Sequence, residues 1–206
     1  MKRNLSLFVA LECALALSAN EIPYAVCAHL SRPGEFETRI REMSLVRDIG
    51  IGSVRTDFDW KYVEPERGKW TFDHLDKLLD DAEKMGVSIL PILDYEVPWA
   101  VRPWDEESIG LWRQYVRTLV SRYRGRCRVW EVWNEQNATQ GGMHPSPTPA
   151  EYVRLLRAAY EEIKSVDPDL RVAIGGLAGV PFDYIEGVYR SGGRDAFDIM
   201  NVHPYQ

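Results

Sequence analysis

The 206-residue sequence has few cysteines, no excess of basic residues and no apolar run long enough to cross a bilayer. Its three cysteines form no C-x-x-C pair and no cluster with histidine, which excludes a disulfide framework and gives no sign of a zinc site. A net charge of −6 does not favour nucleic acid, whose binding proteins usually carry a basic patch. We therefore expect no metal, no cofactor, no nucleic-acid partner and no membrane span, with Cys27 and Cys127 as buried free thiols.

The N-terminus reads differently from the rest of the chain. Two basic residues precede the apolar stretch "LSLFVALECALALSA", and Ala16 and Ser18 supply the small residues of a cleavage site. This pattern predicts a secretory signal peptide over residues 1–19 and a secreted or periplasmic protein. Glu12 is unusual inside such a run, and a buried N-terminal helix is the alternative.

Beyond the leader, strand-like apolar segments alternate with amphipathic helix-like segments. The predicted strands are residues 24–30, 52–58, 87–93, 129–133, 171–177 and 197–203. The predicted helices are residues 35–48, 73–85 and 106–123, a fourth from Thr148 and a shorter fifth after Pro181. Units of roughly thirty residues in this order indicate right-handed βαβ units and a parallel sheet.

Two helix starts carry capping signals. Asp73 is the predicted N-cap of the second helix, which Gly86 ends. The stretch "TPAE" offers Thr148 as N-cap, Pro149 at the first helical position and Glu151 to complete a capping box.

A parallel α/β chain of this kind fits either a doubly wound sheet or a (β/α)₈ barrel. The doubly wound dinucleotide fold needs a glycine-rich turn after its first strand, but the sequence there is "AHLSRPGEFE", with one glycine. The barrel is therefore favoured, as an incomplete (β/α)₈ TIM barrel with about six of its eight strands, over residues 20–206.

Five of the six predicted strands end in polar side chains, and the fifth ends in small residues. The polar ones are His29, Arg55, Asp57, Asp94, Glu96, Asn134, Glu135, His203 and Tyr205. Because the carboxyl ends of barrel strands build the active-site face, this pattern predicts an active site there.

The end of the fourth strand, "VWEVWNEQN", is the most informative stretch. The strand ends in a neutral amide, Asn134, followed by a carboxyl group, Glu135, on the predicted active-site rim. The alternative is a helix-initiating loop that Asn134 caps. Glu131 lies deeper in the barrel, where only an Arg or Lys partner would make its burial tolerable.

The motif "WNEQN" and the segment "WKYVEPERGKWTFDHLDKLLDDAEKMGV" resemble clan A glycoside hydrolases, closest in style to family 39 and β-xylosidase-like members. The resemblance covers about residues 24–206. It implies a retaining hydrolase of β-linked oligo- or polysaccharide, with Glu135 as acid/base and Asn134 on the sugar's 2-hydroxyl group.

The resemblance also carries Arg55, in "VRTDFDW", and His203 and Tyr205, in "NVHPYQ", into the substrate site. A buried Arg at a strand end needs an acidic partner, and we expect the catalytic carboxylates to supply it. For His203 and Tyr205 the alternative is a satisfied core pair.

Three further residues are candidates for sugar contacts. His29 ends the first strand, but a neutral histidine that donates to a backbone carbonyl explains it equally well. Trp99 and His144 lie on loops after the third and fourth strands, with loop packing as the alternative.

A retaining mechanism needs a second carboxylate about 5 to 5.5 Å from the first. The resemblance places it at the end of a seventh strand, beyond Gln206, so we expect the N-terminal three-quarters of a barrel, inactive alone. Asp94 and Glu96 are the local alternatives; Glu186 is predicted to face away from the rim.

Two other functions stay open. A non-catalytic carbohydrate-binding barrel would keep the rim without the nucleophile. A metal-dependent hydrolase would use His29, Asp57 and His203, but the sequence lacks a close His pair. The sugar, the linkage, endo or exo action and the oligomeric state are not determined by the sequence.

Overall fold

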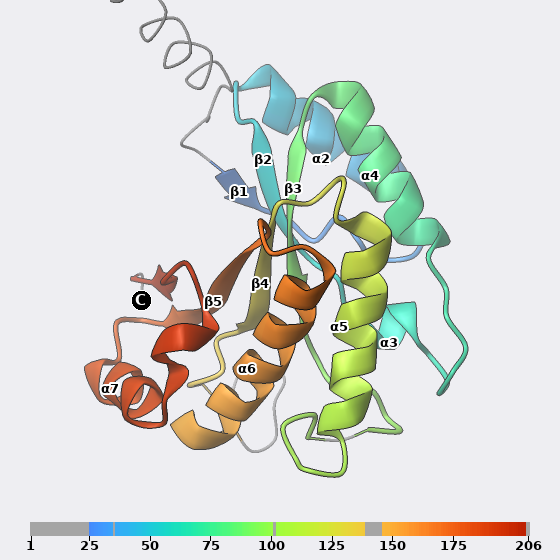
Figure 1. The fold of residues 1–206 in the computed structure, drawn as a ribbon. Coiled ribbons are helices and arrows are strands. Elements are labelled where there is room, and N and C mark those ends of the chain that lie inside the picture. Colours follow the sequence, from blue (N-terminus) through green and yellow to red (C-terminus); the bar gives the residue numbers. More distant parts are fainter. Residues whose placement is uncertain (1–24, 35, 101, 139–145, 205–206) are drawn as a thin grey trace, which may run out of the picture.

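The computed structural model describes residues 25–34, 36–100, 102–138 and 146–204 (Figure 1). The predicted signal peptide, His144 and Tyr205 lie outside the described residues.

The described strands form one parallel sheet in chain order, β1-β2-β3-β4-β5-β6. They are β1 (Ala25–Cys27), β2 (Ser53–Asp57), β3 (Ser88–Leu93), β4 (Val129–Asn134), β5 (Arg171–Ala178) and β6 (Val202–His203). Neighbouring strands are consecutive in sequence, as in a barrel and unlike a doubly wound sheet. The predicted fold is therefore confirmed as a half-barrel, an incomplete (β/α)₈ barrel.

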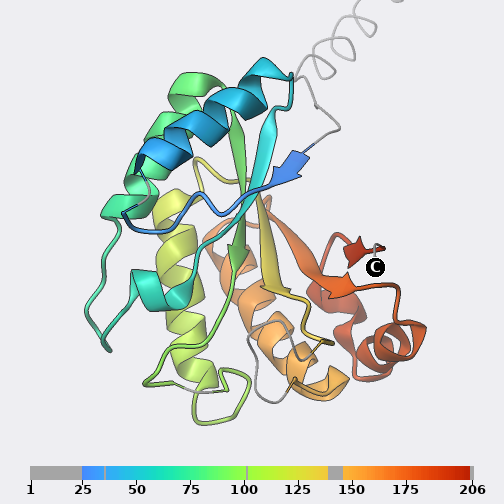
Figure 2. The ribbon, with the colours of Figure 1, turned by 180° about the vertical axis from the view of Figure 1, so that it is seen from behind.

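Helices follow the strands and cover one face of the sheet (Figures 1 and 2). They are α2 (Phe36–Asp48), α3 (Trp60–Val63), α4 (Asp73–Met85), α5 (Ile109–Tyr123), α6 (Pro149–Val166), α7 (Phe182–Arg190) and the 3₁₀ turn η1 (Gly193–Ala196). The core lies between this layer and the sheet. It includes Trp112, Tyr115 and Tyr152, which are fully buried on their helices. Within the described part of the chain, no helix has the length and apolar character needed to cross a membrane.

The two predicted caps turned out differently. At α6, Thr148 and Glu151 form the complete capping box, with the Thr148 amide donating to Glu151 Oε2 over 2.8 Å. At α4, Asp73 is already helical, so the predicted cap was wrong: the N-cap is Phe72, without a side-chain hydrogen bond. Phe72 stacks on Trp70, and this ring contact places the chain where α4 begins.

The prediction of two buried thiols was correct for only one. Both cysteines are free, but Cys127 is buried and Cys27 is exposed. Cys27 lies on β1, at the edge of the sheet, and lines a cavity of about 380 Å³ together with Arg55 and Glu131. Arg55 Nη1 donates to its sulfur over 3.3 Å.

The small residues of β5 have a steric reason. A Cβ added at Gly175 would lie 2.6 Å from the carbonyl oxygens of both Val132 and Trp133. A Cβ added at Gly176 would lie 2.1 Å from Nε2 of His203. Glycine is therefore required at both positions, because β4 and the His203 ring pack directly against the β5 backbone.

Gly176→Ala is expected to destabilise the protein by about 1–3 kcal/mol, because the His203 ring or the β5 backbone must move. The matched control is Gly110→Ala in α5, where an added Cβ meets nothing within 4 Å. That change should be neutral or stabilising by up to about 1 kcal/mol. Urea unfolding measures both, and equal stabilities for the two variants would contradict the packing.

Candidate active site

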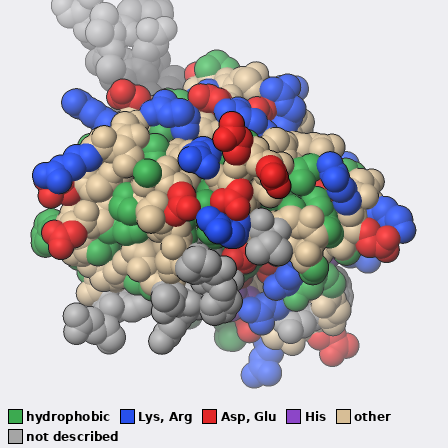
Figure 3. Space-filling model, turned by 90° about the horizontal axis from the view of Figure 1, so that it is seen from below, with side chains coloured by type: hydrophobic (Ala, Val, Ile, Leu, Met, Phe, Trp, Pro, Cys, Tyr) green, Lys and Arg blue, Asp and Glu red, His purple; other side chains and the backbone are tan. Residues whose placement is uncertain are grey.

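The carboxyl ends of the strands lie on the lower side of the molecule in Figure 1. Charged side chains of both signs gather near the middle of that face (Figure 3). The end of β4 has an unusual backbone there: φ is +73° at Trp133 and +47° at Glu135. Left-handed values at non-glycine residues cost about 1–3 kcal/mol each and persist only where the surroundings impose them. Here the Glu135 amide donates to the Gly176 carbonyl over 2.9 Å.

Beneath this end lies the buried side chain of Glu131, paired with Arg55. Arg55 Nε donates to Glu131 Oε2 over 2.7 Å and Nη2 donates to Oε1 over 2.8 Å. The Gly176 amide and Asn201 Nδ2 also donate to Oε1, over 2.8 and 3.0 Å. Glu131 is 0 % exposed, and its four hydrogen bonds come from β2, β5 and the residue before β6.

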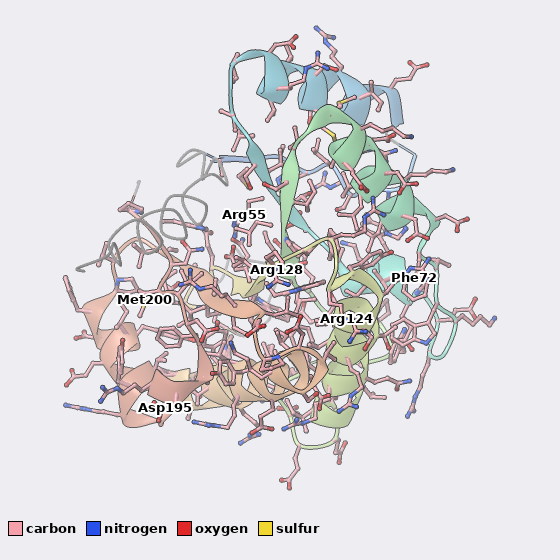
Figure 4. The ribbon with its side chains drawn as sticks, turned by 45° about the horizontal axis from the view of Figure 1, so that its top comes forward. Arg55, Phe72, Arg124, Arg128, Asp195 and Met200 are labelled. Atoms are coloured by element: carbon pink, nitrogen blue, oxygen red, sulfur yellow. The ribbon has the colours of Figure 1, made fainter. Side chains whose placement is uncertain are left out.

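The requirement for a basic partner of Glu131 is thus confirmed. Burial alone would lower the pKa of Arg55, but the hydrogen bonds and negative charge of Glu131 outweigh it and raise that pKa above its ordinary value. The acidic partner of Arg55 was predicted to be a catalytic carboxylate; within the described residues its carboxylate contacts are to Glu131 instead. Arg55 projects from β2 to the side of the sheet that α4 and α5 leave open (Figure 4).

The same guanidinium orients Asn134. Arg55 Nη2 donates to Asn134 Oδ1 over 2.8 Å, which fixes the oxygen of the amide toward the ion pair. The amide nitrogen therefore faces the other way, where the Tyr95 hydroxyl is its partner. A carboxamide nitrogen has two hydrogens, so it can donate to Tyr95 and to a ligand hydroxyl at once.

Glu135 contacts His203 at the rim. His203 Nδ1 lies 2.9 Å from Glu135 Oε1, and the two side chains are 12 % and 26 % exposed. The structure therefore brings Arg55, Asn134, Glu135 and His203 into one connected cluster. The helix-start alternative for Asn134 is not what is observed, since Asn134 is the last residue of β4.

A second polar group lies at the ends of β1 to β3. His29 Nδ1 lies 2.6 Å from Asp57 Oδ2, so the acceptor of His29 is a carboxylate instead of a backbone carbonyl. Asp94 is completely buried, and burial followed by the charges of Asp57 and Asp59 raises its pKa well above the usual range. Burial raises the pKa of Asp59 to about 6, although Lys61, 3.5 Å away, opposes this.

The structure also places Asp94 and Trp99, two further residues that the sequence offered as site candidates. Asp94 has no solvent access, so it cannot attack a sugar bound at the surface. Trp99 is partly buried; its Nε1 donates to the Glu64 carbonyl over 3.2 Å and its ring packs edge-on against Trp60. Those contacts match the loop-packing alternative.

The side chains of the metal hypothesis do not converge, because His29 contacts Asp57 whereas His203 contacts Glu135. Across the described ranges, no group of three or more His, Cys, Asp or Glu residues is arranged to hold a metal ion.

Sequence reasoning missed two members of the site, Tyr95 and Asn201. Tyr95 has a φ of +61° just after β3 and reaches Asn134. Asn201 could have been predicted from its position on the last strand: it stands two residues before His203 and so faces the same side.

Three comparisons connect this geometry to known proteins. The glycoside hydrolase family 42 model, described as beta-galactosidase, matches residues 33–91. Endo-1,4-beta-xylanase B of Thermotoga neapolitana is 26 % identical over 134 residues, which are 60 % of this chain and 38 % of that protein. A solved family 39 glycoside hydrolase from Bacteroides cellulosilyticus WH2 has a TM-score of 0.70 at 28 % identity, covering 88 % of this chain and 38 % of that one.

The predicted resemblance to clan A glycoside hydrolases is confirmed. A family 39 β-xylosidase from Caulobacter crescentus shares the clan A fold, with a TM-score of 0.68 at 21 % identity, over 87 % of this chain and 45 % of that one. The chain spans less than half the length of each relative named here.

Removing one partner of the buried ion pair between Arg55 and Glu131 should strongly destabilise the folded protein. Glu131→Gln leaves the Arg55 guanidinium without its anion and is expected to destabilise the protein by roughly 3–5 kcal/mol. Glu66→Gln, which breaks an ion pair with Lys69 that is 69 % exposed on both sides, should cost less than about 0.5 kcal/mol. Denaturant unfolding of both variants measures the difference, and a Glu131→Gln cost as small as that of Glu66→Gln would refute the role of the pair.

Proposed function

We propose that this chain supplies the acid/base half of a retaining glycoside hydrolase site for β-linked oligo- or polysaccharide. The observation that carries the proposal is the pair at the end of β4. Asn134 has its amide oxygen held by Arg55, and the carboxyl group of Glu135 follows it on the partly exposed rim.

Each residue has a step in this mechanism. Glu135 donates its proton to the glycosidic oxygen as that bond breaks, and later takes a proton from the attacking water. Asn134 donates from its amide nitrogen to a sugar hydroxyl, which places the sugar beside Glu135. His203 holds one carboxyl oxygen of Glu135 and so aims the other at the substrate.

The second carboxylate is proposed to come from outside these 206 residues. Asp94 is fully buried, and Glu131, the carboxylate partner of Arg55, is also 0 % exposed. The relatives are more than twice as long as the part this chain matches. Without that second group, the 206-residue chain is proposed to be inactive alone.

The class of substrate rests on the relatives. Those named as xylanases and β-xylosidases act, by their names, on β-linked sugars. We extend this class to the present chain, and propose His29 and Tyr205 as further sugar contacts.

The test of Glu135 uses the protein from its native gene, with all sequence that accompanies these residues. Glu135→Gln should lower kcat/KM on unactivated β-linked xylo-oligosaccharides by about 100- to 10,000-fold, because the leaving group departs unprotonated. The loss should be much smaller on p-nitrophenyl β-glycosides, which need little protonation.

Glu186→Gln is the matched control, since Glu186 lies exposed on α7 and pairs with Arg190. It should leave both substrates unaffected. Equal losses on the two substrate types would contradict the acid/base role, and sugar binding with no hydrolysis by the native protein would establish the carbohydrate-binding alternative.

We further propose that the protein is exported, from the apolar leader and the small residues at Ala16 and Ser18. The mature protein should then begin near Ala19 or Asn20. N-terminal sequencing of protein recovered from outside the cytoplasm checks this, and an intact Met1 in that sample would end the claim.

A further inference from the structure

The side chain of Asp94 is in an unusual state for a carboxyl group. It is 0 % exposed, and neither of its oxygens accepts a hydrogen bond from a donor in the described part of the chain. Its side-chain partner is another carboxyl group, that of Asp57 at the end of β2. An ionised carboxylate that is fully buried and accepts no hydrogen bond is strongly disfavoured.

Two carboxyl groups in contact bond only if one carries a proton, because a carboxylate is solely an acceptor. Asp57 already has a donor, since His29 Nδ1 lies 2.6 Å from its Oδ2, whereas neither Asp94 oxygen has one within the described residues. The shared proton therefore belongs on Asp94, which donates it to Asp57.

The neighbouring charges agree with this assignment. The groups that face the pair are Arg55 on β2, Asp59 in the segment after it, Lys61 on α3, Tyr95 just after β3 and Tyr115 on α5. Arg55 already donates to Glu131 through Nε and Nη2, and the amine of Lys61 contacts Asp59. Among the residues that the structure describes, Asp94 therefore has no direct cation contact that would stabilise its ionised form.

We propose that Asp94, Asp57 and His29 form a positioning chain, resting on the proposed function. Protonated Asp94 holds the Asp57 carboxyl group in place, and Asp57 holds His29 with its hydrogen on Nδ1. His29 then presents Nε2 at the rim as an acceptor for a sugar hydroxyl. Asp94 and Asp57 do not touch the sugar, while the His29 side chain, 55 % exposed, does.

This assignment specifies the ligand. A neutral imidazole that presents Nε2 can accept a hydrogen bond but cannot donate one. His29 therefore selects a free hydroxyl group and rejects the same position as an ether or a deoxy carbon. Asn134 has the opposite hydrogen-bonding role, since its amide nitrogen donates a hydrogen bond to the sugar.

The first test needs no activity. In protein labelled with ¹⁵N-histidine and ¹³C-aspartate, NMR at pH 8 should show His29 as the Nδ1–H tautomer and Asp94 as a protonated carboxyl group. Asp94→Asn should keep the tautomer, since the amide can donate to Asp57 as the acid does. Asp94→Leu, which cannot donate, should release Asp57 from its position beside His29 and so lose the tautomer. An ionised Asp94, or the Nε2–H tautomer in the parent protein, overturns the proposal.

The second test uses hydrolysis by the native protein. Asp57→Asn and Asp94→Leu should each raise KM by about ten-fold with little change in kcat, the loss expected for one substrate hydrogen bond. Asp94→Asn should restore KM to within about two-fold of the parent value. If KM is unmoved while the tautomer changes as expected, His29 does not contact the sugar and the proposal fails. If no hydrolysis occurs at all, the proposed function fails. The NMR result still decides whether Asp94 is protonated and which tautomer His29 adopts.

Discussion

The ion pair between Arg55 and Glu131 connects the strands that carry the candidate site. Its members stand on β2 and β4, and Glu131 also accepts hydrogen bonds from Gly176 on β5 and from Asn201, next to β6. A buried pair of this kind adds little net stability, because desolvation of the two charges offsets their attraction. Its consequence here is geometric: the guanidinium that binds Glu131 also fixes the amide of Asn134, so the deep charge pair sets the direction of a rim side chain.

Above the pair, close packing against β5 imposes the strained end of β4. The positive φ values of Trp133 and Glu135 occur where β4 lies against Gly175 and Gly176, and the second glycine also leaves room for the His203 ring. His203 then contacts Glu135. Two positions without side chains therefore leave the room in which this carboxyl group and its histidine partner lie, and strain of this kind is often retained at functional sites.

The sequence was sufficient for the elements and for several site residues, because these depend on local pattern. Apolar periodicity gave the parallel βα units, "TPAE" gave a real capping box, and strand ends gave Arg55, Asn134, Glu135 and His203. What it could not give depends on partners far apart in the chain. Asn201 meets Glu131 across 70 positions, and the contact between Asp57 and Asp94 joins two different strand ends. The exposure of Cys27 likewise follows from the edge position of β1.

The central claim is that the rim built on this ion pair holds a β-linked sugar with Glu135 at its glycosidic atom. A crystal structure of the native protein with a sulfur-linked β-disaccharide tests it most directly, because the thioether resists hydrolysis. The account predicts the Glu135 carboxyl group in contact with the linking sulfur and Asn134 Nδ2 within about 3 Å of a hydroxyl on the adjoining sugar. A disaccharide bound away from both residues would contradict it.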